Sequence, residues 1–207
     1  MKHWKLLLVP IVLLIMGCST ISYDISLEKV NIVNPSNEEF TNIIKDDINK
    51  YTFNDDKIKI SWILSASQFN FNLLNQTTEP MEIIWDKCTY IDINNKNHRL
   101  IHSGVKYVER NNSHPNTIII PNSSIDDMIY PSDYVYYVEG KNGGWKERPL
   151  FDFLRELNSN IEEKNDSNII KKYIGKTVQT MLTLQINNDI YSYIFIFRIN
   201  DYKLIKE

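Results

Sequence analysis

Alternation of apolar and polar residues, with a period of two, is the feature that most constrains this chain. Residues 57–64 (KIKISWIL) and 68–73 (QFNFNL) each place their large apolar side chains at every second position. Successive side chains of a β-strand point to opposite faces, so this period predicts strands buried on one side. The clearest hairpin joins 177–186 to 190–199 through Asn187-Asn188, because Asn tolerates the positive φ of a tight turn.

Shorter apolar runs predict further strands, which lie at 51–53, 81–85, 88–93, 99–102, 105–108 and 117–120. Strands spaced by about ten residues, with turns between them, favour an all-β sandwich or barrel over βαβ units. Residues 121–149 are interrupted by Pro and Gly and are expected to be irregular.

Two short helices are also expected. Ser36 and Glu39 match a capping box, and apolar residues follow at near-helical spacing, which predicts a helix over about 37–50. Asp46-Asp47 in its second half opposes the helix dipole. Apolar residues at helical spacing between 151 and 161 predict the second helix.

The chain begins with a basic segment, an apolar run of about a dozen residues and Gly17-Cys18. A membrane-spanning helix needs roughly 20 apolar residues, so the run fits a secretory leader better than a span. Ile15-Met16-Gly17-Cys18 resembles the lipobox of bacterial lipoproteins, although Leu is commoner than Ile15 and a small residue or Val commoner than Met16. The resemblance implies cleavage before Cys18 and attachment of acyl chains to its thiol. An ordinary leader that happens to end in Cys is the alternative.

This organisation divides the chain into a signal peptide (1–17), a lipidated Cys18 with a polar tether (18–35) and one domain (36–207). Two or more acyl chains give a stable anchor, whereas one gives only reversible binding. Ser19 follows the cysteine, and the first acidic residue after it is Asp24. In lipoproteins this pattern implies the periplasmic side of the outer membrane, with the outer leaflet of the plasma membrane as the alternative.

Charge and cysteine content limit the partners. The formal net charge is −3, and losing Lys2 and Lys5 with the leader makes it −5. No basic patch is visible, so a nucleic-acid partner is not expected. Without a Lys/Arg cluster for anionic lipid, membrane contact is expected through the acyl chains alone. Lipidation of Cys18 leaves Cys88 without a disulfide partner; a Cys18–Cys88 bridge is the competing idea.

A second resemblance covers most of the mature chain. The runs FNFNLLNQTTEPMEIIWDKCTYIDINNKNHRLIHSGVKY (Phe69 to Tyr107), GKTVQTMLTLQI and YSYIFIFRI look like uncharacterised lipoproteins common in the Bacteroidetes. The shared features are strand patterns and turns. The resemblance implies a mainly β, immunoglobulin-like antiparallel sandwich with one or two short helices, and it transfers no functional residue.

Candidate chemistry is sparse. His98 and His102 are four residues apart and His114 follows in a loop, but a closed zinc site needs three or four ligands, so solvated turn histidines are favoured. Cys88 is expected to be a small buried side chain and not a nucleophile paired with a histidine. Adjacent acids point to different sides of a strand, so the acidic pairs do not form catalytic dyads by themselves. No metal, cofactor or phosphate-binding motif is predicted.

Aromatic residues in the irregular section offer a candidate binding surface, namely Tyr130, Tyr134, Tyr137 and Trp145. Flat rings on loops can stack on sugars or anchor a protein. The alternative, favoured by their alternating spacing, places these rings in the core. The sequence therefore favours a membrane-anchored, non-catalytic binding or structural module of the cell envelope, with an envelope protein or a glycan as partner. An envelope hydrolase whose acids converge only in three dimensions is the second hypothesis.

Overall fold

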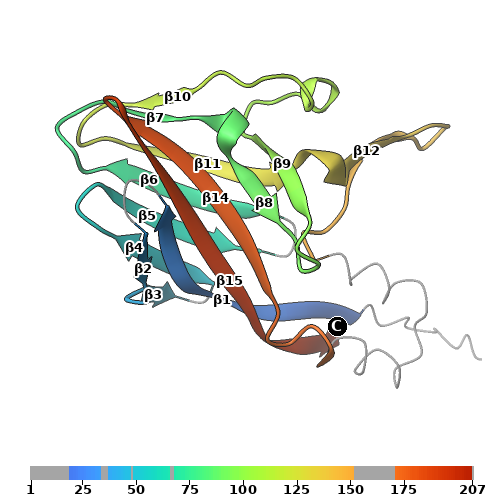
Figure 1. Ribbon diagram of the computed structural model, residues 1–207. Helices are drawn as coiled ribbons and strands as arrows, with labels where there is room; N and C mark the ends of the chain where they lie inside the picture. Colours follow the sequence, from blue (N-terminus) through green and yellow to red (C-terminus); the bar gives the residue numbers. More distant parts are fainter. Residues whose placement is uncertain (1–18, 34–36, 48, 66–67, 152–170, 207) are drawn as a thin grey trace, which may run out of the picture.

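The computed structural model describes residues 19–33, 37–47, 49–65, 68–151 and 171–206, which form a curled antiparallel sheet (Figure 1). Its strands are β1 (Ser19–Val33), β2 (Glu38–Phe40), β3 (Ile44–Asp47), β4 (Lys50–Asn54), β5 (Ile58–Leu64), β6 (Phe69–Asn75), β7 (Met81–Ile83), β8 (Thr89–Ile91), β9 (Asn97–His102), β10 (Thr117–Ile119), β11 (Ser124–Pro131), β14 (Thr177–Ile186) and β15 (Asp189–Lys206). A separate hairpin consists of β12 (Val135–Val138) and β13 (Gly144–Glu147). Three single-turn 3₁₀ helices are η1 (Trp85–Lys87), η2 (Tyr107–Glu109) and η3 (Ser132–Tyr134).

The main sheet follows one hydrogen-bonded path, β2-β1-β15-β14-β8-β9-β11-β6-β5-β4-β3, with β7 also on β14 and β10 on β7. The mainly β, antiparallel class predicted from the sequence is confirmed. An immunoglobulin-like sandwich has two separate sheets, whereas here the path through β8, β9 and β11 joins both faces of the core.

Aromatic side chains fill the space enclosed by the curl. The ring of Trp62 on β5 lies 5.0 Å from that of Phe195 and 5.4 Å from that of Phe197, both on β15. Phe69 on β6 lies 4.7 Å from Phe197. These contacts join strands more than 120 positions apart in the sequence, so the curl is held by long-range burial of large rings.

The alternating stretches form strands as predicted. Every second side chain of β5 and β6 is buried, in the order that the sequence indicated. The closing hairpin is also confirmed: β14 and β15 pair from Thr177↔Arg198 to Ile186↔Asp189, and Asn187 has φ 54° in the turn. The central strands could be read locally because each has one apolar face.

The stretch expected to be a tether is instead β1, which pairs with β15 from Ser19 to Val33. Its polar residues alternate with buried Ile25, Leu27 and Val30, but a bulge between Leu27 and Lys29 breaks the period. The strand was not predicted because a bulge inserts an extra residue, so that every residue after it points to the opposite face from the one expected.

The predicted helix over 37–50 is wrong, because its residues form β2 and β3 at the two edges of the sheet. Phe40 packs edge-on against Phe53 at 5.6 Å. Thr52 donates a hydrogen bond of 2.5 Å to the Asp46 carboxylate across β3 and β4. Tertiary pairing thus overrode a local capping signal.

The section expected to be irregular contains β11 and the β12–β13 hairpin, and the predicted strand at 105–108 is replaced by η2. Among the described residues, no helix is long and apolar enough to cross a membrane. The leader with Cys18, and all of the helix predicted at 151–161 except Phe151, lie outside the described residues.

Candidate functional site

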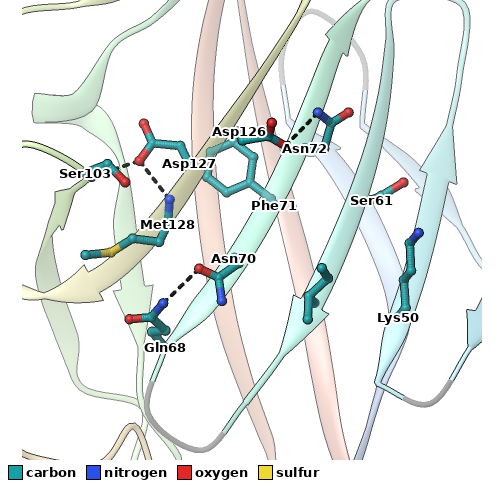
Figure 2. Close-up of a pocket in the computed structure, with 11 residues that line it drawn as sticks. Lys50, Ser61, Gln68, Asn70, Phe71, Asn72, Ser103, Asp126, Asp127 and Met128 are labelled. Carbon is teal, nitrogen blue, oxygen red and sulfur yellow. Dashed lines mark hydrogen bonds between the residues drawn. The ribbon is translucent and has the colours of Figure 1, made fainter.

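An open groove of about 570 Å³ crosses the outer face of β4, β5, β6 and β11 (Figure 2). Its lining is polar apart from a few side chains, and consists of Lys50, Ser61, Ile63, Gln68, Asn70, Phe71, Asn72, Ser103, Asp126, Asp127 and Met128. The alternation that buries Trp62 and Phe71 turns the neighbouring polar residues outward, so one pattern produces both the core and the groove.

The groove's amides follow one another along β6 and the residue before it, and strand register places polar residues of β5 and β11 beside them. Asn72 pairs with Ser61 on one side and with Asp126 on the other. Its Nδ2 donates to Asp126 Oδ1 at 2.9 Å, and Gln68 Nε2 donates to Asn70 Oδ1 at 2.8 Å. A side-chain amide has two donor hydrogens and two acceptor lone pairs, so these bonds orient the amides and leave capacity for a ligand.

Asp127 closes one end of the groove and is held by the protein. Its Oδ1 accepts hydrogen bonds from the backbone N–H of Ser103 at 2.8 Å and of Met128 at 2.7 Å. Its Oδ2 lies 3.4 Å from His102 Nδ1. Burial alone would raise the pKa of Asp127, but the imidazole and the two backbone donors outweigh it and lower that pKa. Asp127 therefore remains an anion committed to the scaffold.

The histidines are not solvated, contrary to the favoured prediction. His98 is 4% exposed; its Nδ1 lies 2.8 Å from Asp133 Oδ1, and its Nε2 lies 3.3 Å from Asp92 Oδ2. His98 thus bridges the β8–β9 turn to η3. The spacing of four put His98 and His102 on one strand, but each has its own partners.

His102 on β9 also lies beside His114, which is in the loop before β10. The imidazole of His102 stacks on the Trp85 indole with ring centroids 4.0 Å apart and an angle of 2° between the planes. His114 lies 5.6 Å from His102 and is 7% exposed. Burial, and then the nearby Arg99 charge, lower the pKa of His114. The described residues contain no group of three His, Cys, Asp or Glu side chains placed to hold a metal ion.

Cys88 is a buried free thiol, as predicted. Its Sγ donates to the Ile84 carbonyl at 3.3 Å and accepts from the Thr183 N–H at 3.3 Å. Burial raises its pKa to about 12. A nucleophilic cysteine needs the opposite shift, because the thiolate is the reactive form.

Two of the four residues predicted to form an aromatic surface are buried, and the other two are exposed. Tyr130 and Tyr134 are 2% and 5% exposed, and the Tyr130 hydroxyl donates to the Arg148 carbonyl. Tyr137 and Trp145 face each other on the β12–β13 hairpin and are 60% and 37% exposed. The core alternative is therefore correct for the first pair, and a surface position is correct for the second.

The groove residues Ser61, Asn70 and Asn72 were missed as candidates. Their outward positions were visible in the alternation, but an outward polar residue usually faces only water. Strand order gathers them, and the order β11-β6-β5-β4 depends on contacts far apart in sequence.

The chain matches no family model, no curated protein and no solved structure.

Proposed function

We propose that the chain is a lipid-anchored envelope protein whose domain binds a neutral, hydroxyl-rich ligand, such as a glycan, in the groove on β4, β5, β6 and β11. The main support for this proposal is the set of amides and hydroxyls in that groove. Groups that both donate and accept suit sugar hydroxyls, which do the same. The exposed Ile63 and the partly buried Met128 lie on either side of Asn70 and add apolar contacts for the faces of sugar rings.

The anchor follows from the lipobox-like sequence that ends in Cys18. The first described residue, Ser19, is already in β1, so an acylated Cys18 would hold the domain close to the bilayer. We retain the periplasmic side of the outer membrane as the proposed location. We also propose a distant immunoglobulin-like relationship, in which the two layers of the sandwich have been joined into one curled sheet through β8, β9 and β11; the support is a core packed between facing strands.

A hydrolase is the weaker proposal. Asp126 and Asp127 both line the groove, but Asp126 accepts from Asn72 and Asp127 is held by two backbone donors and lies beside His102. A general acid requires a carboxyl with a raised pKa, whereas that of Asp127 is lowered. The buried, protonated Cys88 offers no nucleophile.

Calorimetry with neutral oligosaccharides, including N-acetylhexosamine oligomers, tests the groove. The double variant Asn70→Ala with Asn72→Ala should weaken binding at least about tenfold, since each unpaired polar group on a ligand costs about 1 kcal/mol or more. Asn94→Ala removes an exposed amide outside the groove and is the matched control. Equal affinity in all three proteins would refute the assignment.

Metabolic labelling with a fatty-acid analogue tests the anchor. The wild-type protein should carry label and Cys18→Ala should not, because Cys18 provides the acylated thiol. Unchanged labelling in the variant would contradict the proposal. Protease treatment of intact cells tests the location, and ready digestion would exclude the periplasmic side.

A further inference from the structure

The β12–β13 hairpin carries the densest group of exposed apolar side chains in the described parts of the chain. It is a two-stranded sheet outside the main hydrogen-bonded path, and it stands away from the main sheet in Figure 1. Tyr137 is 60% exposed, and Tyr136, Val138 and Trp145 are each more than a third exposed. Exposed rings on a separate hairpin contribute little to the core and present apolar surface for an external contact.

Basic side chains surround these rings. The guanidinium of Arg110 lies over the Trp145 ring at 4.9 Å, and that of Arg148 over the Tyr136 ring at 5.4 Å. Lys141 and Lys146 are exposed on the hairpin. Glu139 and Glu147 are also exposed on the hairpin and equal its two lysines in number, so the positive charge nearest the rings is that of Arg110 and Arg148.

The hairpin and the start of β1 lie at the same end of the sheet (Figure 1). β11 ends at Pro131 opposite Leu100 on β9, and β12 follows immediately after η3. The paired segments 19–24 and 201–206 extend beyond the start of β14 at this same end, by about 20 Å for six residues. An anchor at Cys18 therefore directs this end of the sheet toward the bilayer.

We propose that the β12–β13 hairpin is a second membrane contact, which places Trp145 and Tyr137 among the headgroups of an anionic phospholipid bilayer while its basic residues bind the phosphates. This inference rests on the proposed lipid anchor. Trp and Tyr prefer the membrane interface because their rings are apolar and their edges polar. Exposed lysines are attracted to an anionic surface. The acyl chains are then not the only contact, contrary to the prediction from composition.

Tryptophan fluorescence provides a selective test. Trp62 and Trp85 are buried, and Trp4 lies in the leader, so Trp145 is the tryptophan after Cys18 that lipid can reach. The protein purified from the envelope is reconstituted into phosphatidylglycerol–phosphatidylcholine vesicles with brominated acyl chains. Quenching that is present in the wild type and absent in Trp145→Phe is expected. Equal emission in brominated and plain vesicles would overturn the proposal.

Charge variants test the lipid class. Lys141→Glu with Lys146→Glu should weaken binding of the Cys18→Ala protein to anionic vesicles by about tenfold or more. The matched control, Lys59→Glu with Lys87→Glu, changes the net charge equally at exposed positions on β5 and η1 and should have a much smaller effect. An equal loss in both pairs would mean that general charge repulsion, and not the hairpin, determines binding, and would overturn the proposal.

The mass of the purified protein separates the two hypotheses. If no acyl chains are found, the anchor proposal fails. The hairpin can still be tested by coupling Cys18 to a maleimide lipid, because Cys88 is buried and does not compete. Quenching of Trp145 in that preparation would support the hairpin contact, and its absence would refute it.

Discussion

Trp62 and Trp145 are both strand tryptophans surrounded by aromatic rings, yet they occupy opposite environments. Trp62 is on β5, which pairs with a strand on each side, and it is fully buried against Phe71, Phe195 and Phe197. Trp145 is on β13, whose one partner among the described strands is β12. In the described part of the chain its ring contacts rings no more than 40 positions away. A ring stabilises the fold when distant strands enclose it, and is free for external binding when only a local hairpin supports it.

Truncating the enclosed ring should have the largest effect. Trp62→Ala is expected to lower the free energy of unfolding by about 3–5 kcal/mol, because it opens a cavity at the centre of the curled sheet. Chemical denaturation monitored by circular dichroism measures it. Trp62→Phe should lower stability less, since the indole N–H has no hydrogen-bond partner among the described residues. A loss below about 1 kcal/mol for Trp62→Ala would break the contrast with Trp145.

His98 is a buried polar residue, and its substitution should have the next-largest effect on the free energy of unfolding. His98→Phe removes both carboxylate contacts and leaves the buried Asp92 oxygen unpaired, so a loss of about 1–3 kcal/mol is expected. Lys96→Ala is the matched control, because the exposed Lys96 lies 3.6 Å from the same Asp133 carboxylate. Exposed ion pairs contribute little, and this variant should lose less than about 1 kcal/mol.

His114 should have a smaller effect, seen as a pH dependence of the free energy of unfolding. Its ring nitrogens have no hydrogen-bond partner among the described residues. Its pKa is lowered in the folded protein from the ordinary 6.5, so the unfolded chain binds a proton first as the pH falls. The stability it contributes is complete above pH 6.5 and is lost below it. Carboxylates titrate mainly below about pH 5, so a change in unfolding free energy between about pH 5 and 7 is due mainly to histidines.

The His114→Gln variant isolates this contribution. The slope of unfolding free energy against pH, measured between about pH 5 and 7, should be smaller in the variant than in the wild type. The charged groups facing His114 are Arg99 and Asp86, with His102 beside it, and all of them are unchanged by the substitution. An identical slope in both proteins would show that His114 keeps its ordinary pKa.

Truncation of the exposed ring should have the smallest effect on the fold. Trp145→Ala is expected to change the free energy of unfolding by no more than about 0.5 kcal/mol, the usual range for surface substitutions. The same variant should lose the contact with vesicles described above. A large loss of stability would mean that the hairpin belongs to the folding core, and the difference between the two tryptophans would then be one of degree.

Central strands were predictable because their evidence is local. The apolar face of β5 is Ile58, Ile60 and Trp62, and any pairing that buries it gives the same strand. Edge strands β2 and β3 lacked such a face, and their sequence also suited a helix. Their structure depends on Phe40 meeting Phe53 and on Thr52 bonding to Asp46. The first contact joins β2 and β4, which are not neighbours in the sheet, and the second requires β3 and β4 to be paired as a hairpin.

Local patterns in the sequence were enough to predict the antiparallel β class, the closing hairpin, the inert character of Cys88 and an anchor at Cys18. Tertiary structure alone decided that Tyr130 and Tyr134 are buried while Tyr137 and Trp145 are exposed, that His98 bridges two carboxylates, and that four strands assemble a polar groove. The physical reason is the distance along the sequence over which each kind of information extends. Periodicity reports which face of one strand is apolar, whereas a site depends on which strands become neighbours and in what register.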